Sequence, residues 1–275
     1  MSYLQSIVLG IIQGLTEFLP ISSSGHLALL QNLFGLEDQS TQIFFDVLLH
    51  VVTLLAIIMI YYKKIWKLLV CLIEMIIDIF RKEKKADADD MRFVFFIVIA
   101  TLPLFIAAPF KDHIEGFFGN ILVIGIALLV TATLLLLSDR VKDTPKTLNE
   151  ARFTDILIVG IAQTIALIPG LSRSGTTIST GVFRGLTRET AVEFSFILAI
   201  PAILGATILQ IRDVMRDGFP AEQLPIYLTG CAFAFVFALA AIQLVKLLAK
   251  KGAFKYFAVY CYIVGVIAIA STFFG

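Results

Sequence analysis

The sequence is poor in charged residues. Only 16% of its 275 residues are Asp, Glu, Lys or Arg, whereas soluble domains carry about 25%. Hydrophobic residues make up 59% of the chain, and its mean hydropathy is +0.92. A globular core cannot hide so much apolar surface, so we expect an integral membrane protein with the lipid bilayer as its solvent.

Cysteines are also few, and the net charge is small. Cys71, Cys231 and Cys261 lie in apolar runs without metal-ligand spacing or a disulfide framework, which indicates packing residues. A net charge of +1 and the lack of a basic tract argue against a nucleic-acid partner. No basic residue precedes the first apolar stretch and no small-residue cleavage pattern follows it, so we expect no removed signal there.

Long apolar runs predict six transmembrane helices, because a hydrocarbon core of ~30 Å takes ~20 helical residues. The six runs are residues 43–62, 92–110, 120–138, 190–211, 225–249 and 254–274. Two further apolar regions, 3–34 and 153–186, are each interrupted by proline and glycine near the middle, which ends a helix. Each half is too short to span, so we expect two re-entrant helical hairpins whose tips are buried in protein or face water.

Basic residues predict the orientation. Lys and Arg number eight in 63–92, four in 139–152 and four in 246–255, which places these loops in the cytoplasm. The loops 111–119 and 212–224 hold only three such residues and fall outside. Region 65–80 carries a narrow polar stripe on an apolar helix, so we expect it to lie at the membrane interface.

The chain also contains an internal repeat. Residues 1–138 and 153–275 both read as one hairpin followed by three spans, within a single membrane domain. An odd number of spans separates the hairpins, so they enter from opposite sides. Gln163, Ser172, Ser174 and Gly175 match residues 13, 22, 24 and 25 at one offset of 150. Inverted repeats of this kind place a binding site near the midplane.

The tip of the first hairpin carries residues suited to phosphate chemistry. Gln13 and Glu17 are four residues apart and share one helix face. Three serines, residues 22–24, then begin a second half-helix, whose free N–H groups and positive dipole end bind anions. His26 lies in its first turn and can act as an acid, a base or a nucleophile near neutral pH.

The second tip repeats this pattern and adds a guanidinium. Arg173 at membrane depth costs ~2.5–3.5 kcal/mol even on mild scales, so it needs a partner, and phosphate oxygens match its planar fork. Phosphoryl transfer needs charge neutralisation, a positioned nucleophile and often a divalent metal. Glu17 together with diphosphate oxygens suits Mg²⁺ or Ca²⁺, which prefer oxygen ligands.

Structural roles compete with these assignments. Ser22 and Ser24 could simply cap a helix, Glu17 and Arg173 could form an ion pair between the repeats, and His26 could be a satisfied core residue. Asp46 and Glu193 each begin a predicted span and fit first-turn caps. His50 lies within a span and fits packing or support better than catalysis.

Two segments resemble the signature motifs of a known family. Residues 13–26 read QGLTEFLPISSSGH and residues 169–178 read PGLSRSGTTI. They resemble the motifs of the bacterial undecaprenyl-diphosphatase family, which is associated with bacitracin resistance, and EFSFILAIP at 193–201 resembles a further family segment. The resemblance covers the whole chain in length and order. Gln13 stands where some members carry a glutamate, which puts a mechanism with two carboxylates in this motif in question.

The resemblance implies an activity and a set of site residues. The activity is hydrolysis of undecaprenyl diphosphate to undecaprenyl phosphate and inorganic phosphate, which renews the lipid carrier for peptidoglycan precursors. It also implies dependence on a divalent metal, held by Glu17, and a site opening to the outer face of the bacterial plasma membrane. The implied catalytic positions are Glu17, Ser23, His26 and Arg173. The residues expected to bind substrate are Gln13, Ser22, Ser24, Gly25, Ser172, Ser174, Gly175 and Thr177.

We therefore predict an all-helical membrane hydrolase. Arg173 binds the diphosphate, and Ser23 or His26 attacks the terminal phosphorus; we favour Ser23, with His26 taking its proton. The rival function is a transporter or lipid flippase, because inverted repeats with broken helices are typical of transporters. Only the hydrolase releases phosphate. The sequence leaves a homodimer open.

Overall fold

The structure is a computed structural model in which the chain forms helices. It describes residues 1–36, 39–81, 87–110, 113–114, 116–142, 146–217 and 221–274. Within these ranges there is no β-strand, and one isolated bridge pairs Lys146 with Leu186. Six helices are long and apolar enough to cross a membrane, which confirms the predicted all-helical, multi-pass class.

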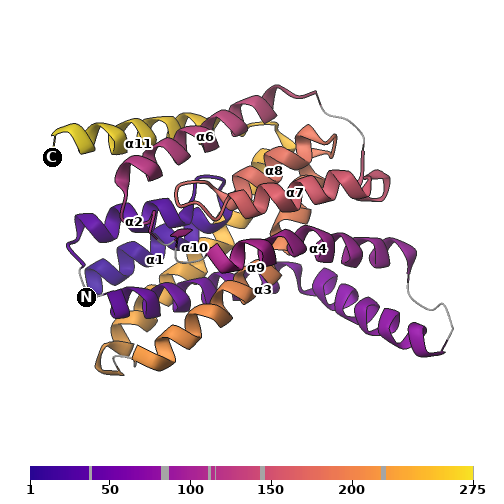
Figure 1. The fold of residues 1–275 in the computed structure, drawn as a ribbon, viewed down its shortest axis with the longest axis horizontal. Helices are drawn as coiled ribbons and strands as arrows, with labels where there is room; N and C mark the ends of the chain where they lie inside the picture. Colours follow the sequence, from indigo (N-terminus) through magenta and orange to yellow (C-terminus); the bar gives the residue numbers. More distant parts are fainter. Residues whose placement is uncertain are drawn as a thin grey trace.

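The helices follow the predicted order (Figure 1). In the first half they are α1 (Tyr3–Phe18), α2 (Ser23–Leu33), α3 (Gln39–Arg81), α4 (Ala88–Ala107), the 3₁₀ turn η1 (Ala108–Phe110) and α6 (Ile121–Arg140). In the second half they are η2 (Leu148–Glu150), α7 (Phe153–Ile165), α8 (Arg173–Phe183), α9 (Arg188–Asp217), η3 (Ala221–Gln223), α10 (Leu224–Lys250) and α11 (Lys255–Phe274). The candidate spans are α3, α4, α6, α9, α10 and α11.

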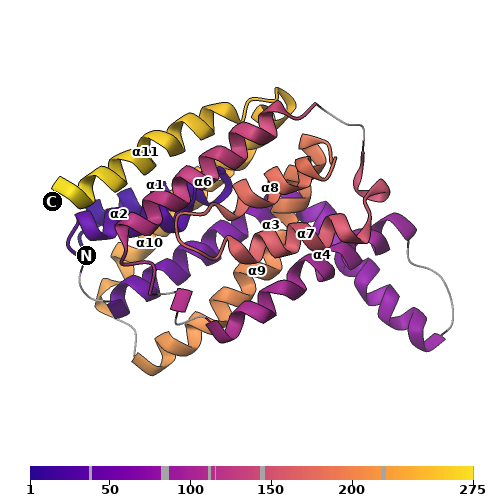
Figure 2. The ribbon, with the colours of Figure 1, turned by 45° about the horizontal axis from the view of Figure 1, so that its top comes forward.

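Helix α3 joins two segments that we predicted separately. The predicted span 43–62 and the predicted interfacial helix 65–80 form one helix, bent at Tyr61, where φ is −104° and ψ is 19°. Beyond Tyr61 the helix leaves the bundle (Figure 2), with Trp66 70% exposed and Ile73 56% exposed. The predicted boundary is thus a kink and not a loop, and the interfacial position of residues 65–80 stays a prediction.

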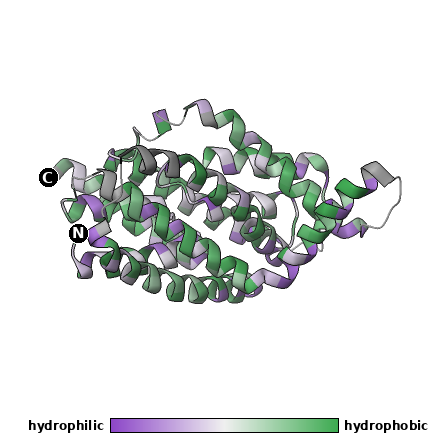
Figure 3. Cartoon of the chain, turned by 90° about the horizontal axis from the view of Figure 1, so that it is seen from below, coloured by the Kyte–Doolittle hydropathy of each residue, from purple (hydrophilic) through white to green (hydrophobic). Residues whose placement is uncertain are grey.

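Apolar side chains cover the outside of the bundle. Hydrophobic residues dominate the helices in Figure 3, and large side chains such as Ile208, Val236 and Ile267 are each more than 60% exposed. A water-soluble monomer rarely exposes apolar surface on this scale. A bilayer accepts it, because the helices satisfy their backbone polar groups internally.

Each hairpin packs against a candidate span through glycines at equivalent positions. A Cβ atom on Gly10 of α1 would lie 2.1 Å from the carbonyl oxygen of Gly230 in α10. One on Gly160 of α7, at the offset of 150 residues, would lie 2.6 Å from the carbonyl oxygen of Ala100 in α4. Small residues allow helix backbones to approach this closely in membranes. The equivalent packing supports the repeat, and its inverted topology across a membrane stays a prediction.

Candidate functional site

The tips of the two hairpins meet. Helices α2 and α8 approach each other at their N-terminal ends, and α1 and α7 lead into them (Figures 1 and 2). A Cβ atom on Gly25 would lie 3.0 Å from the Cα atom of Gly170, and one on Gly175 would lie 3.1 Å from the carbonyl oxygen of Pro20. Gly25 and Gly175 therefore allow the close spacing between the tips, because a Cβ atom at either position would need the opposite tip to shift by a few tenths of an ångström.

Serines at equivalent positions cap both half-helices. Ser22 Oγ accepts a hydrogen bond from the Gly25 N–H at 3.2 Å, and Ser172 Oγ accepts one from the Gly175 N–H at 3.0 Å. The structure therefore shows the capping role for Ser22 that the sequence left open. Each cap hydroxyl also lies within 3.4 Å of the serine hydroxyl two residues later, which is Ser24 or Ser174.

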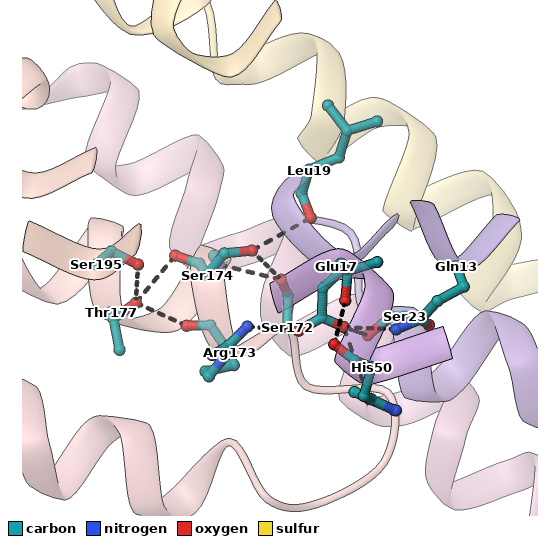
Figure 4. Close-up of polar contacts among 12 residues, drawn as sticks. Gln13, Glu17, Leu19, Ser23, His50, Ser172, Arg173, Ser174, Thr177 and Ser195 are labelled. Atoms are coloured by element: carbon teal, nitrogen blue, oxygen red, sulfur yellow. Dashed lines mark hydrogen bonds and ion pairs between the residues drawn. The ribbon is translucent and has the colours of Figure 1, made fainter. Parts of the chain in front are cut away.

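Glu17 is the centre of a polar network between the tips (Figure 4). Its Oε1 accepts a hydrogen bond of 2.5 Å from Arg173 Nη2, across the two hairpins. Its Oε2 accepts one from Ser23 Oγ at 2.7 Å and one from Gln13 Nε2 at 3.0 Å. The ion pair that the sequence left open between the repeats is therefore present, and three of the four predicted catalytic residues lie together.

Other predicted residues of the second tip hold the loops in place. Ser174 Oγ donates to the carbonyl oxygen of Leu19 at 3.2 Å and so connects the two hairpins. Thr177 Oγ1 donates to the carbonyl oxygen of Arg173 at 2.8 Å and lies 2.6 Å from Ser195 Oγ (Figure 4). Ser195 was missed, although it lies within the family-like segment 193–201. Its hydrogen bond to Thr177 links α9 to the helix that carries Arg173.

The imidazole of His26 is not hydrogen-bonded to Ser23. The imidazole is buried, its Nδ1 lies 2.7 Å from the carbonyl oxygen of Ser22, and its Nε2 lies 2.8 Å from the hydroxyl of Tyr260 in α11. Both ring nitrogens are therefore engaged away from Glu17. Tyr260 carries no local sequence signal of a site residue, because it lies in the last apolar span, remote in sequence from either tip.

His50, in contrast, reaches the network from α3. Its Nε2 lies 3.8 Å from Glu17 Oε2, and its Nδ1 lies 2.7 Å from the carbonyl oxygen of Asp46. This position fits the supporting role that we expected. The side chain of Asp46 accepts two hydrogen bonds from Gln31 Nε2, at 3.0 and 3.2 Å. Asp46 does not cap α3 as predicted, since the helix begins seven residues earlier, at Gln39.

Glu193 lies in a second polar region. It lines a cavity of about 350 Å³ between α3, α4, η2 and α9, together with Lys64, Lys67 and Asp90. The prediction of a first-turn cap is wrong here too, because α9 begins at Arg188. This cavity contains none of the residues that contact Glu17.

Two buried atoms of the Glu17 network have no hydrogen-bond partner within the described part of the chain. They are Nη1 of Arg173, a donor, and Oε1 of Gln13, an acceptor. Buried polar atoms are nearly always paired, so each indicates a missing partner. An anion satisfies the donor, and a cation satisfies the acceptor.

The oxygens around Glu17 fit a divalent cation. The described residues contain no cluster of three or more His, Cys, Asp or Glu side chains. Mg²⁺ and Ca²⁺ nevertheless prefer oxygen, and Mg²⁺ is often held by one or two carboxylates plus substrate phosphates. The Glu17 carboxylate, the unpartnered Oε1 of Gln13 and the Ser23 hydroxyl supply such oxygens.

Comparisons with known proteins agree over nearly the whole chain. The undecaprenyl-diphosphatase of Desulforapulum autotrophicum is 38% identical over 279 aligned positions, which cover 99% of both chains. That of Alkaliphilus metalliredigens is 39% identical, over 98% of both chains. That of Methanosphaera stadtmanae is 41% identical, over 97% of this chain and 96% of the relative. The model of the family described as bacitracin resistance protein BacA matches residues 6–267. The chain therefore belongs to the BacA family.

Proposed function

We propose that this protein hydrolyses undecaprenyl diphosphate to undecaprenyl phosphate and inorganic phosphate. Relatives named for this activity match it from end to end, at 38–41% identity. The family's association with bacitracin resistance agrees with this function, and the shared activity favours a hydrolase over a transporter or flippase. The site between the hairpin tips is where we place the reaction.

The observation that carries this placement is the unpartnered nitrogen of Arg173. Its Nη2 binds Glu17, whereas its Nη1 is buried without a partner among the described residues. A guanidinium binds phosphate through two parallel hydrogen bonds. A diphosphate at this position satisfies Nη1 at once, and it takes over Nη2 when the ion pair with Glu17 opens.

Ser23 is the proposed nucleophile. Its Oγ–H already points at Glu17 Oε2, at 2.7 Å, so the proton lost during attack has an acceptor in place. As the Oγ–P bond forms on the terminal phosphorus, the bond to the bridging oxygen breaks and undecaprenyl phosphate leaves. Water then attacks the phosphoserine, which releases inorganic phosphate and returns the proton to Ser23.

Glu17 and Gln13 are the proposed ligands of a divalent cation, Mg²⁺ or Ca²⁺. Glu17 Oε1 becomes free when Arg173 turns to the phosphate, and Gln13 Oε1 has no other partner in the described structure. A bound cation supplies positive charge to the phosphate oxygens. Arg173 would supply the other positive charge that faces the diphosphate.

The membrane setting is also part of the proposal. We place the protein in the bacterial plasma membrane with its basic loops in the cytoplasm and the site opening to the outer face, where the lipid substrate enters from the bilayer. The equivalent contacts of Gly10 and Gly160 support two repeats, which we propose to be inverted. A homodimer is compatible with this arrangement.

Phosphate release tests the function. The purified full-length protein in detergent is given undecaprenyl diphosphate, with Mg²⁺, with Ca²⁺ or with a chelator. We expect inorganic phosphate to appear with either cation and to stop with the chelator. A pure transporter releases none under any condition, so the absence of phosphate release contradicts the proposal.

A further inference from the structure

The backbone just before the proposed nucleophile is strained. Ser22 has φ of +74° and ψ of 99°, and among the described residues it is the one non-glycine residue with positive φ. L-residues rarely adopt this region of φ and ψ. Such a conformation persists only where surrounding contacts fix it, and it is frequent at functional sites.

The contact that fixes Ser22 comes from His26. The carbonyl oxygen of Ser22 lies 2.7 Å from His26 Nδ1 and also accepts a hydrogen bond of 3.3 Å from the His26 backbone N–H. A carbonyl oxygen can only accept, so Nδ1 carries the proton. In the neutral ring, Nε2 then has the lone pair, and it accepts the hydrogen bond of 2.8 Å from the Tyr260 hydroxyl.

Tyr260 in turn fixes the imidazole. The two rings are stacked, with centroids 5.5 Å apart and planes inclined by 10°, so both rotation and tilt of His26 are restricted. With Nδ1 donating and Nε2 accepting, neither ring nitrogen is free to take a proton from Ser23. This geometry differs from the base role that we assigned to His26 from the sequence.

We propose that Tyr260, His26 and Ser22 form a strut that aims the hydroxyl of Ser23 at Glu17. Ser22 directly precedes Ser23, so the orientation of its peptide group sets the direction of the next side chain. His26 and Tyr260 are then positioning residues, and Glu17 receives the proton of Ser23. This inference rests on the proposed hydrolysis at Ser23.

Two replacements of His26 separate positioning from proton transfer. The amide nitrogen of asparagine lies close to the place of Nδ1, whereas that of glutamine lies close to the place of Nε2. His26→Asn can therefore still donate to the Ser22 carbonyl, and His26→Gln cannot reach it. Neither amide is a base. We expect His26→Asn to keep kcat within about tenfold of wild type and His26→Gln to lose about 100-fold, the usual cost of a misplaced reacting group.

The expected loss is in kcat with KM unchanged, because the replaced side chain acts on the direction of the Ser23 hydroxyl and not on the guanidinium proposed to bind the diphosphate. Equal losses in the two variants, or a better rate for glutamine, overturn the strut and favour proton transfer through Nε2. Gel filtration and thermal unfolding confirm that each variant is folded. If either variant is not folded, Tyr260→Phe and its control test the strut instead.

Tyr260→Phe removes only the hydroxyl, and Tyr262→Phe is its matched control. Tyr262 lies on the same helix and its hydroxyl contacts Thr133 Oγ1, at 2.9 Å. We expect Tyr260→Phe to lower kcat several-fold with KM unchanged, and Tyr262→Phe to behave as wild type. A Tyr260→Phe variant with wild-type kcat overturns the strut.

A spectroscopic measurement tests the strut without turnover. The chain has three histidines, so ¹⁵N-histidine labelling gives few signals, and His26→Asn identifies those of His26. We expect a neutral ring protonated on Nδ1 at pH 8, and a changed Nε2 resonance in Tyr260→Phe. A ring protonated on Nε2 overturns the strut. If the wild type releases no phosphate, the proposed function fails, whereas this measurement still decides the geometry.

Discussion

Arg173 of the second hairpin donates a hydrogen bond of 2.5 Å to Glu17 of the first, and its other terminal nitrogen is buried without a partner in the described residues. A purely structural ion pair needs one contact between opposite charges. A guanidinium with one unpartnered terminal nitrogen can also bind a second ligand that offers two oxygens, such as a phosphate. The chemistry of that nitrogen distinguishes the functional role from the structural one.

Arg173→Lys tests that distinction. Lysine keeps the positive charge and can still pair with Glu17, but it cannot bridge two phosphate oxygens. We expect thermal stability close to wild type and a loss of about 10²–10³ in kcat, the cost of removing one preorganised donor. The control is Arg184→Lys, which alters another arginine that binds one carboxylate, Asp155, through two nitrogens. If the Arg173 variant hydrolyses the lipid within a few-fold of wild type, its bidentate role is refuted.

Glu17→Gln removes the charge that holds the cation and receives the Ser23 proton. The amide oxygen can still accept hydrogen bonds, so we expect expression and folding near normal and metal-dependent phosphate release lowered by at least about 10². Glu189→Gln, which alters an exposed carboxylate at the start of α9, should leave the rate unchanged. Wild-type turnover by Glu17→Gln at saturating Mg²⁺ and Ca²⁺ excludes Glu17 as the metal ligand.

Gln13→Glu places a second carboxylate beside Glu17. Gln13 now donates its amide hydrogen to Glu17 Oε2 at 3.0 Å, so the variant exchanges a hydrogen bond for repulsion unless a cation lies between. We expect a rate within about tenfold of wild type (~1.4 kcal/mol of barrier), and a larger rise in thermal stability on adding Mg²⁺. Complete loss of activity shows instead that the site cannot accommodate the second charge.

Single cysteines test the orientation of the hairpins. All three native cysteines are buried, and they can be removed to give a clean background. Asn149→Cys lies on a basic loop and should react only from the cytoplasm, whereas Gly119→Cys and Glu222→Cys should react from outside. Labelling of Asn149→Cys from outside contradicts the proposed orientation, and labelling of Asn149→Cys and Gly119→Cys from the same side contradicts the inverted repeat. Single cysteines at residues 83–90 and 143–149 should likewise react only from the cytoplasm. Of these, residues 83–86 and 143–145 lie outside the described structure.

Local patterns predicted the elements well because each carries a strong physical signal. Long apolar runs predict spans. Pro20 and Pro169 each follow the end of one half-helix, and a serine caps the start of the next. The kink at Tyr61 was taken for the boundary between a span and an interfacial helix, because a kinked helix and two helices joined by a short loop have the same hydropathy pattern. Asp46 and Glu193 were placed at helix starts for the same reason, because helix ends are poorly marked in apolar sequence.

The sequence predicts a site residue well where its position on a helix decides which neighbours its side chain contacts. Gln13 and Glu17 follow from helical spacing, and Ser23 follows from its place after the break. His26 lies three residues from Ser23, yet its ring contacts the Ser22 carbonyl oxygen and the hydroxyl of Tyr260, more than 230 residues away in sequence. A tertiary contact of that range leaves no local signal, which is why Tyr260 was not predicted.

Ser23 provides the most direct test of nucleophilic catalysis at this site. Ser23→Ala and Ser24→Ala each remove one half-buried hydroxyl from neighbouring positions, but only that of Ser23 contacts Glu17. The measurement is the rate of phosphate release from undecaprenyl diphosphate by the two purified variants and the wild type, with Mg²⁺. We predict that Ser24→Ala stays within about tenfold of wild type and that Ser23→Ala loses at least about 10³, as expected when a nucleophile is removed. Equal rates in the two variants contradict the role of Ser23 as the nucleophile.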